Sequence, residues 1–129
     1  MKLEKIKGLL VEPYKLPYEI NIENTLEEKQ KLVGGYIECT YLMDDDEVVL
    51  ICNEEGKMLG MDLNRDIGHD IIAGPFLILG DNQDSGDFES LTQKQINKYK
   101  KVFDEQSIEN TQKRVINILK NRKNERGDR

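Results

Sequence analysis

Four polar residues of the chain combine the side-chain types and the positions expected of a ligand-binding site. Arg65 carries a planar, permanently charged guanidinium in an otherwise acidic region, and Asn64 beside it can both donate and accept hydrogen bonds. Tyr36 follows a glycine pair where a strand is expected to begin, and Asn53 ends the expected partner strand. Polar groups at strand ends often line pockets. We interpret Arg65, Asn64, Tyr36 and Asn53 as candidate ligand-binding residues for a small anionic ligand.

A purely structural role for Arg65 is the competing interpretation. Asp62 and Asp66 lie close to it in the sequence. Ion pairs between such neighbours are common on charged surfaces. The sequence therefore leaves open whether Arg65 binds a ligand or forms a structural ion pair.

The residues that usually perform catalysis do not form a recognisable arrangement. His69 is the sole histidine, and its neighbour Asp70 would point to the opposite face of a strand. The serines lack a nucleophile motif, and neither a Walker A sequence nor a G-x-G-x-x-G sequence is present. We therefore favour a binding protein over an enzyme, and a small nucleotide hydrolase stays as a third hypothesis.

Metal ligands are also too few for a structural metal site. A zinc site needs four ligands, and the chain has two cysteines and one histidine. The run Asp44-Asp45-Asp46 lacks the alternating ligands and the distal glutamate of a calcium-binding loop. The sequence predicts neither a metal nor an organic cofactor.

The two cysteines lie in apolar runs on either side of the three aspartates. A two-residue turn at Asp45-Asp46 would place Cys39 directly opposite Cys52 in an antiparallel pair. A cross-strand thiol pair is sterically feasible there, but two small buried apolar residues are the favoured interpretation.

The elements that must position these groups follow from hydrophobic patterning. Strands are expected at 5–12, 18–23, 36–43, 47–53 and, with a break at Gly74-Pro75, at 70–80. A helix begins after Thr25 and ends at Gly34-Gly35, since glycine tolerates the left-handed conformation after a helix. Thr92 begins a further helical segment.

This C-terminal segment has one apolar face, and its sequence fits either two helices or one long helix. Ile96, Tyr99, Val102 and Phe103 share a face, and Ser107 is a candidate cap for a second helix. That helix would turn Ile108, Val115, Ile116 and Leu119 inward. A single long, bent helix over 92–123 is the alternative, because the range contains no glycine or proline.

The resulting fold class is α+β. A mostly antiparallel sheet of about five strands carries one internal helix and a C-terminal helical segment. We divide the 129 residues into an α+β domain at 1–103 and a C-terminal helical extension at 104–129 with a frayed basic end over 121–129.

Charge is distributed unevenly along the chain. Residues 1–90 carry 20 acidic and 8 basic side chains, whereas residues 91–129 carry 5 acidic and 11 basic ones. The basic segment could bind nucleic acid, dock on its own acidic body or pair with a second copy. Because the acidic body would repel phosphates, nucleic acid is the less favoured partner and a homo-oligomer remains among those expected.

Targeting signals are not evident. No apolar run reaches the roughly 18 residues that a membrane span needs, and the first residues lack the apolar stretch of a secretory signal. We expect a cytoplasmic protein with reduced cysteines, and no membrane partner.

Several ordered motifs resemble one group of proteins. They are NTLEEKQKLVGGYIE at 24–38, ICNEEGK at 51–57, LNR at 63–65, DIIAG at 70–74 and SLTQKQINKY at 90–99. The group is an uncharacterised family of small proteins, a domain of unknown function, from phages, plasmids and other mobile elements of largely Gram-positive bacteria. The likeness covers residues 6–103, and it supplies no catalytic residues.

The resemblance implies an accessory gene whose product would act in the cytoplasm of a host cell. We therefore expect a non-enzymatic binding protein that sequesters or blocks a host factor, either a small nucleotide used as a defence signal or a host protein. The alternative is a nucleic-acid-related inhibitor or binder, with an acidic body that mimics DNA or a basic C-terminal helix that contacts DNA or RNA.

Overall fold

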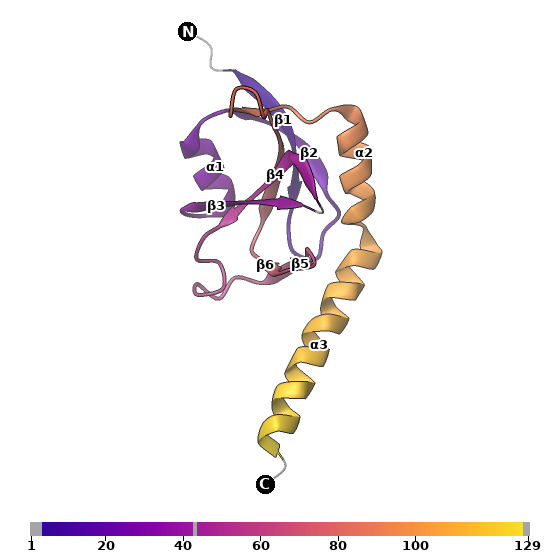
Figure 1. The fold of residues 1–129 in the computed structure, drawn as a ribbon. Helices are drawn as coiled ribbons and strands as arrows, with labels where there is room; N and C mark the ends of the chain where they lie inside the picture. Colours follow the sequence, from indigo (N-terminus) through magenta and orange to yellow (C-terminus); the bar gives the residue numbers. More distant parts are fainter. Residues whose placement is uncertain (1–3, 43, 128–129) are drawn as a thin grey trace.

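A computed structural model describes residues 4–42 and 44–127, and it confirms the α+β class. Figure 1 shows a twisted antiparallel sheet with a helix on either side and a long helix that extends away from the body. The strands are β1 (Lys5–Val11), β2 (Tyr18–Glu23), β3 (Ile37–Leu42), β4 (Asp45–Asn53), β5 (Leu63–Asp66), β6 (Ile71–Ala73), β7 (Phe76–Asp81) and β8 (Phe88–Glu89). The helices are α1 (Leu26–Val33), α2 (Gln93–Val102) and α3 (Glu105–Gly127).

The main sheet has the strand order β2-β1-β7-β4-β3, with β8 paired to β7, and every pairing is antiparallel. The central strand β7 is buried on both faces over Phe76–Gly80, which explains its continuous apolar run. The strands β5 and β6 form a separate two-stranded sheet. The expected strand at 70–80 therefore divides at Gly74-Pro75 into members of two different sheets.

The two faces of the main sheet bury two apolar clusters. One face packs against α2 through Ile96, Tyr99 and Phe103, as the periodicity predicted. The other packs against α1 through Val33. In Figure 1, α1 and α2 lie on opposite sides of the sheet.

Local sequence signals set the ends of the first two helices. Thr25 accepts a hydrogen bond from the Glu28 amide, and Gly34 ends α1 with φ 81°. Thr92 and Gln95 form a complete capping box at the start of α2. The start and the end of α1 and the start of α2 were predicted from these signals.

The C-terminal segment consists of two helices rather than one. The backbone turns at Phe103 and Asp104. The carboxylate of Asp104 accepts the Ser107 amide at 3.1 Å, so Asp104 rather than Ser107 caps α3. The predicted frayed end covered 121–129; α3 is helical to Gly127, and residues 128 and 129 lie outside the described part of the chain.

The favoured interpretation of two buried cysteines is confirmed for Cys52 and wrong for Cys39, which is exposed, and the direct pairing that a turn at Asp45-Asp46 would give does not occur. Cys39 lies opposite Ile51, and Cys52 lies opposite Glu38. Asp45 and Asp46 belong to β4, and Asp45 pairs with Leu42, so the turn does not lie at Asp45-Asp46. A register irregularity between Thr40 and Leu42 then sets the pairing of the cysteines. Because neighbouring residues of a strand face opposite ways, the two thiols lie on different faces of the sheet.

Candidate functional site

Arg65 is fully buried, and its guanidinium is engaged by the protein itself. Its Nε donates to the Ser107 hydroxyl at 2.8 Å, and its terminal nitrogens donate to Asn64 Oδ1 at 2.9 Å and to the carbonyls of Lys15 and Phe103 at 2.6 and 3.1 Å. Burial lowers the pKa of Arg65. Arg65 thus joins β5, the β1–β2 loop and the junction of α2 with α3.

Asn64 is buried in the same network. Its amide nitrogen donates to the carbonyls of Val11 and Gly74 at 2.8 and 2.9 Å, while its oxygen accepts from Arg65. Among the six ion pairs of residues 4–42 and 44–127, none involves Arg65; Asp66 pairs with Arg114 instead. The geometry therefore favours a structural role for Asn64 and Arg65, through backbone carbonyls rather than through Asp62 or Asp66.

Tyr36 and Asn53 lie near each other without forming one site. Tyr36 is 67% exposed, whereas Asn53 is buried. Asn53 donates to the Val33 carbonyl at 3.1 Å and accepts the Glu55 amide at 2.7 Å. Asn53 thereby connects the end of α1 to the turn after β4. The four sequence-predicted residues are thus not gathered around one cavity.

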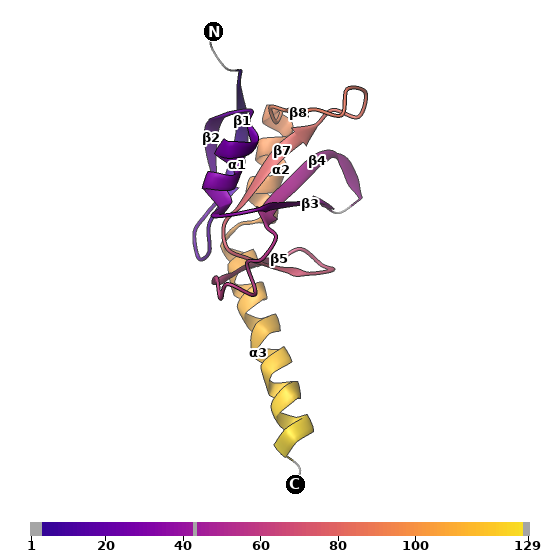
Figure 2. The same ribbon diagram turned by 90° about the vertical axis from the view of Figure 1, so that its left-hand side faces the viewer.

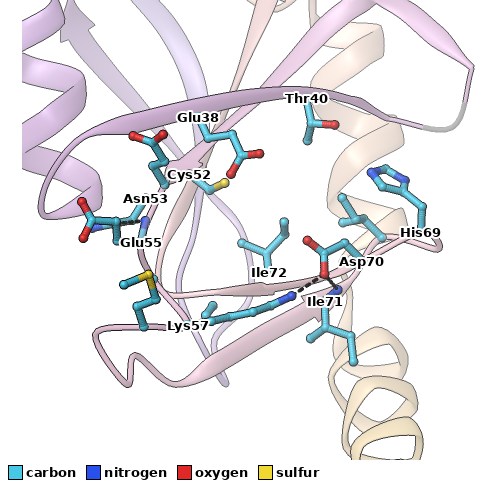
Figure 3. A pocket seen from close by; sticks show the side chains of 15 residues that line it. Glu38, Thr40, Cys52, Asn53, Glu55, Lys57, His69, Asp70, Ile71 and Ile72 are labelled. Atoms are coloured by element: carbon cyan, nitrogen blue, oxygen red, sulfur yellow. Dashed lines mark hydrogen bonds and ion pairs between the residues drawn. The ribbon is translucent and has the colours of Figure 1, made fainter.

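A polar cleft with a volume of about 400 Å³ lies between β3 and the β5–β6 sheet. Glu38 and Thr40 on β3 form one wall, Cys52 on β4 contributes to the floor, and Lys57 and Asp70 form the opposite wall (Figure 3). Of the four predicted residues, Asn53 alone lines this cleft.

Negative charge dominates the cleft. Glu38, Glu54, Glu55 and Asp70 line it together with a single lysine, Lys57. That lysine forms an ion pair with Asp70. Burial acts to raise the pKa of Asp70, but hydrogen bonds from Lys57 and the Ile71 amide outweigh it and leave the pKa below its ordinary value. The cleft thus attracts cations or hydrogen-bond donors more strongly than anions.

Cys52 and His69 both line the cleft. Burial raises the pKa of the Cys52 thiol to about 11, so this sulfur is protonated and weakly nucleophilic at neutral pH. His69 makes no side-chain hydrogen bond to a described residue that would orient it as a base. Within the described residues, no group of three or more His, Cys, Asp or Glu is arranged to hold a metal ion.

Patterning could not find this cleft, because its walls come from segments up to 35 positions apart in the sequence. A weak signal did exist. Glu54, Glu55 and Lys57 form a charged turn directly after β4, and His69-Asp70 directly precedes β6. Only the packing of the β5–β6 sheet against β4 brings these turns together.

Lys29 is a second buried cation that the sequence did not indicate. Its ammonium donates to Asn24 Oδ1 at 2.8 Å and to the Thr25 carbonyl at 3.2 Å, and it lies 4.9 Å from the centre of the Phe88 ring. Burial lowers its pKa. These contacts tie the first turn of α1 to β8.

No described helix is long and apolar enough to cross a membrane. Comparisons with curated proteins and with solved structures find no match to the chain. Residues 6–104 match the model of the family described as "Domain of unknown function (DUF3846)". All residues that line the cleft lie within this range. The chain belongs to that family.

Proposed function

We propose that the protein is a non-enzymatic binding protein that blocks a host protein by holding a basic, extended segment of it in the acidic cleft. The observation that carries the proposal is the charge of the cleft, where four carboxylates outnumber one lysine. A lysine-rich or arginine-rich segment would find hydrogen-bond acceptors on both walls.

The position of β3 supports an extended partner. β3 is the last strand in the order β2-β1-β7-β4-β3, so one of its backbone edges has no strand partner among the described residues. Such an edge can pair with an added strand, and side chains of that strand would reach the cleft wall formed by Glu38 and Thr40.

The same charges argue against a nucleotide signal as the ligand of this cleft. Phosphates are bound by unpaired cations or by clustered backbone amides, and Lys57 is already paired with Asp70. Arg65, the residue first considered for an anion, has its donors directed at backbone carbonyls, Ser107 and Asn64. Of the two classes of host factor, a protein is therefore favoured.

The setting of this activity rests on the resemblance to proteins of phages, plasmids and other mobile elements. Small acidic accessory proteins of such elements often bind and block factors of the host cell. Within this proposal the partner is a host protein, and binding takes place in the host cytoplasm.

Fluorescence anisotropy with labelled extended peptides tests the proposal. One peptide carries alternating arginines, and its counterpart carries glutamates at the same positions. We expect saturable binding of the basic peptide, at least about tenfold weaker in the double variant Glu38→Lys/Glu55→Lys. The matched control Glu27→Lys/Asp84→Lys changes net charge equally at exposed sites that do not line the cleft.

Equal weakening in both double variants would mean that only overall charge matters, and it would overturn the cleft as the site. A cyclic dinucleotide or ATP that binds more tightly than the basic peptide would overturn the choice of partner.

One observation favours a second candidate, nucleic-acid binding by α3. Residues 113–123 contain five basic and no acidic side chains, and Lys120 and Lys123 are exposed. Salt-sensitive binding of duplex DNA that is lost in Lys120→Glu/Lys123→Glu, and kept in Glu38→Lys/Glu55→Lys, would support this candidate.

A further inference from the structure

The helix α3 packs against the body only along its first half. The Asp66 amide donates to the Thr111 hydroxyl at 2.9 Å, and Arg114 pairs with the Asp66 carboxylate and donates to the Gly68 carbonyl at 3.2 Å. From Ile116 to Lys123 every side chain is exposed. Figure 1 and Figure 2 both show this second half extending beyond the body.

Apolar side chains on the projecting half remain uncovered. Ile116 is 50% exposed and Leu119 is 57% exposed. The prediction that these two residues face inward is therefore wrong: Ile116 borders an open groove between α3 and the body, and Leu119 does not line that groove. Two large aliphatic side chains one turn apart on a solvated helix indicate a surface that a partner covers.

A groove with a volume of about 510 Å³ continues this surface toward the body. One side of the groove is formed by α3 residues such as Gln112 and Ile116, and the other by Tyr14 and Met61. Tyr14 is 57% exposed. The groove, whose lining also includes the polar Asp62 and Gln112, thus adjoins the apolar surface of the projecting helix at Ile116.

Charge along α3 is divided into two blocks. Residues 104–112 contain three acidic and no basic side chains, whereas residues 113–123 contain five basic and no acidic ones. Two such helices attract each other when they run antiparallel, because each acidic block then faces a basic block. A parallel pair would place like charges together.

The spacing of the exposed residues is compatible with the same orientation. Glu105, Glu109, Gln112, Ile116, Leu119 and Lys123 are separated by alternating steps of four and three positions, the spacing of a coiled-coil seam. All six are exposed. The six positions are symmetric about residue 114. Two copies of the helix that run in opposite directions can therefore align all six positions with each other.

We propose that α3 pairs antiparallel with the α3 of a second copy of this chain, centred on residue 114. In this register, Glu105 of one copy faces Lys123 of the other, and Gln112 faces Ile116 of the other. Glu109 faces Leu119 of the other copy, next to Lys120. Each Ile116 reaches the groove of the other copy, because Gln112 lines that groove. The contact extends over about 27 Å of helix, given a rise of about 1.5 Å per residue.

The oligomeric state of the full chain tests the pairing. Sedimentation velocity or light scattering over a dilution series should give a dimer for the wild type. The variant Ile116→Asp/Leu119→Asp should be monomeric, with a dissociation constant raised by at least about tenfold. The control Asn110→Asp/Asn117→Asp adds the same charge on the opposite side of the helix and should stay dimeric.

Charge reversal gives a second test that does not depend on apolar contacts. Glu105→Lys/Glu109→Lys and Lys120→Glu/Lys123→Glu should each be monomeric alone, and should form a mixed dimer when combined. A wild type that is monomeric at every concentration would overturn the proposal. Two reversed variants that fail to associate when mixed would overturn the charge-based register.

Crosslinking reports the orientation. In a Cys39→Ser background, Glu105→Cys/Lys123→Cys should give a disulfide-linked dimer under mild oxidation, while Glu105→Cys alone should not. Efficient linkage of the single variant would indicate a parallel pair and would overturn the proposed orientation. All substituted positions are exposed, so the body of the protein stays folded in each variant.

Discussion

The guanidinium of Arg65 donates a hydrogen bond of 2.9 Å to the side-chain oxygen of its neighbour Asn64, and both side chains are buried. From this pair, hydrogen bonds reach β1, the β1–β2 loop, the β6–β7 connection and the α2–α3 junction. The motif LNR at 63–65 therefore holds together segments that the backbone hydrogen bonds of the main sheet do not join.

Replacing Arg65 by alanine should destabilise the fold strongly. The variant leaves the buried Phe103 carbonyl and Asn64 oxygen without this donor and opens a cavity, which together cost about 3 kcal/mol or more. Urea unfolding followed by circular dichroism measures the change. The exposed substitution Lys113→Ala serves as control, with an expected change below about 0.5 kcal/mol. Unchanged stability in Arg65→Ala would refute the structural role and return Arg65 to the candidates for ligand binding.

Gly56 should not tolerate a side chain. A Cβ atom at this position would lie 2.6 Å from the Ala73 carbonyl oxygen, closer than real contacts allow, so Gly56→Ala must displace β6 and the cleft wall beside it. We expect a loss of about 2 kcal/mol in the free energy of unfolding. Gly60→Ala is the matched comparison, because it meets no atom within 4 Å and carries only the cost of φ +72°, about 1 kcal/mol. If both variants lose the same free energy of unfolding, the Ala73 carbonyl moves aside at little cost, and the steric argument is wrong.

Acidification should weaken the protein through Asp45 and Asp66. Burial acts to raise the pKa of each carboxyl, but hydrogen bonds from Tyr99 to Asp45 and from Arg114 to Asp66 outweigh it and lower the pKa below its ordinary value. Since the folded-state pKa is depressed, the stabilisation is present above the unfolded-state value near about 4 and is lost as the pH falls through the folded-state value. Urea midpoints measured as the pH is lowered from neutrality should decrease most steeply below about pH 4.

The variants Asp45→Asn and Asp66→Asn provide the check on this assignment. Each should be less stable than wild type at neutral pH, and each should lose less stability on acidification. Asp84→Asn, in an exposed loop, should follow the wild-type curve. Identical pH profiles for all three variants and the wild type would rule out these two carboxyls as the source of acid sensitivity.

The two cysteines should behave independently. Cys39 is exposed, whereas Cys52 is buried with its pKa raised to about 11, and their strand positions put them on opposite faces of the sheet. Alkylation of the native protein followed by mass spectrometry should modify Cys39 and leave Cys52 unmodified until denaturant is added. An intramolecular disulfide formed under native, oxidising conditions would contradict the observed register.

Local signals were sufficient to predict most of the elements. The alternation at 18–23, the threonine caps of α1 and α2, and the glycine pair after α1 act over a few residues, so their outcome does not depend on the rest of the fold. The division of the C-terminal segment into two helices was harder to predict. Its cap, Asp104, lies one turn earlier than Ser107, and the bend there is held by the distant Arg65 through the Phe103 carbonyl.

Side-chain environment was harder to predict than secondary structure. Arg65 was singled out correctly as unusual, but its surroundings depend on Lys15, Phe103 and Ser107, which are 38 to 50 positions away in sequence. Its role as a ligand-binding residue stays a prediction that the geometry disfavours, as does that of Asn64. Tyr36 stays a candidate on the surface, and Asn53 lines the cleft.

By itself the sequence determined the α+β class, the antiparallel pairing of neighbouring strands and the charge contrast between body and tail, because these depend on periodicity and on composition. The tertiary structure alone decided that β7 lies between β1 and β4, that a register irregularity separates the two thiols, and that distant turns form an acidic cleft. It also decided that Ile116 and Leu119 stay uncovered. These outcomes depend on how far each packed surface extends in space, and neither residue spacing nor propensity encodes that extent.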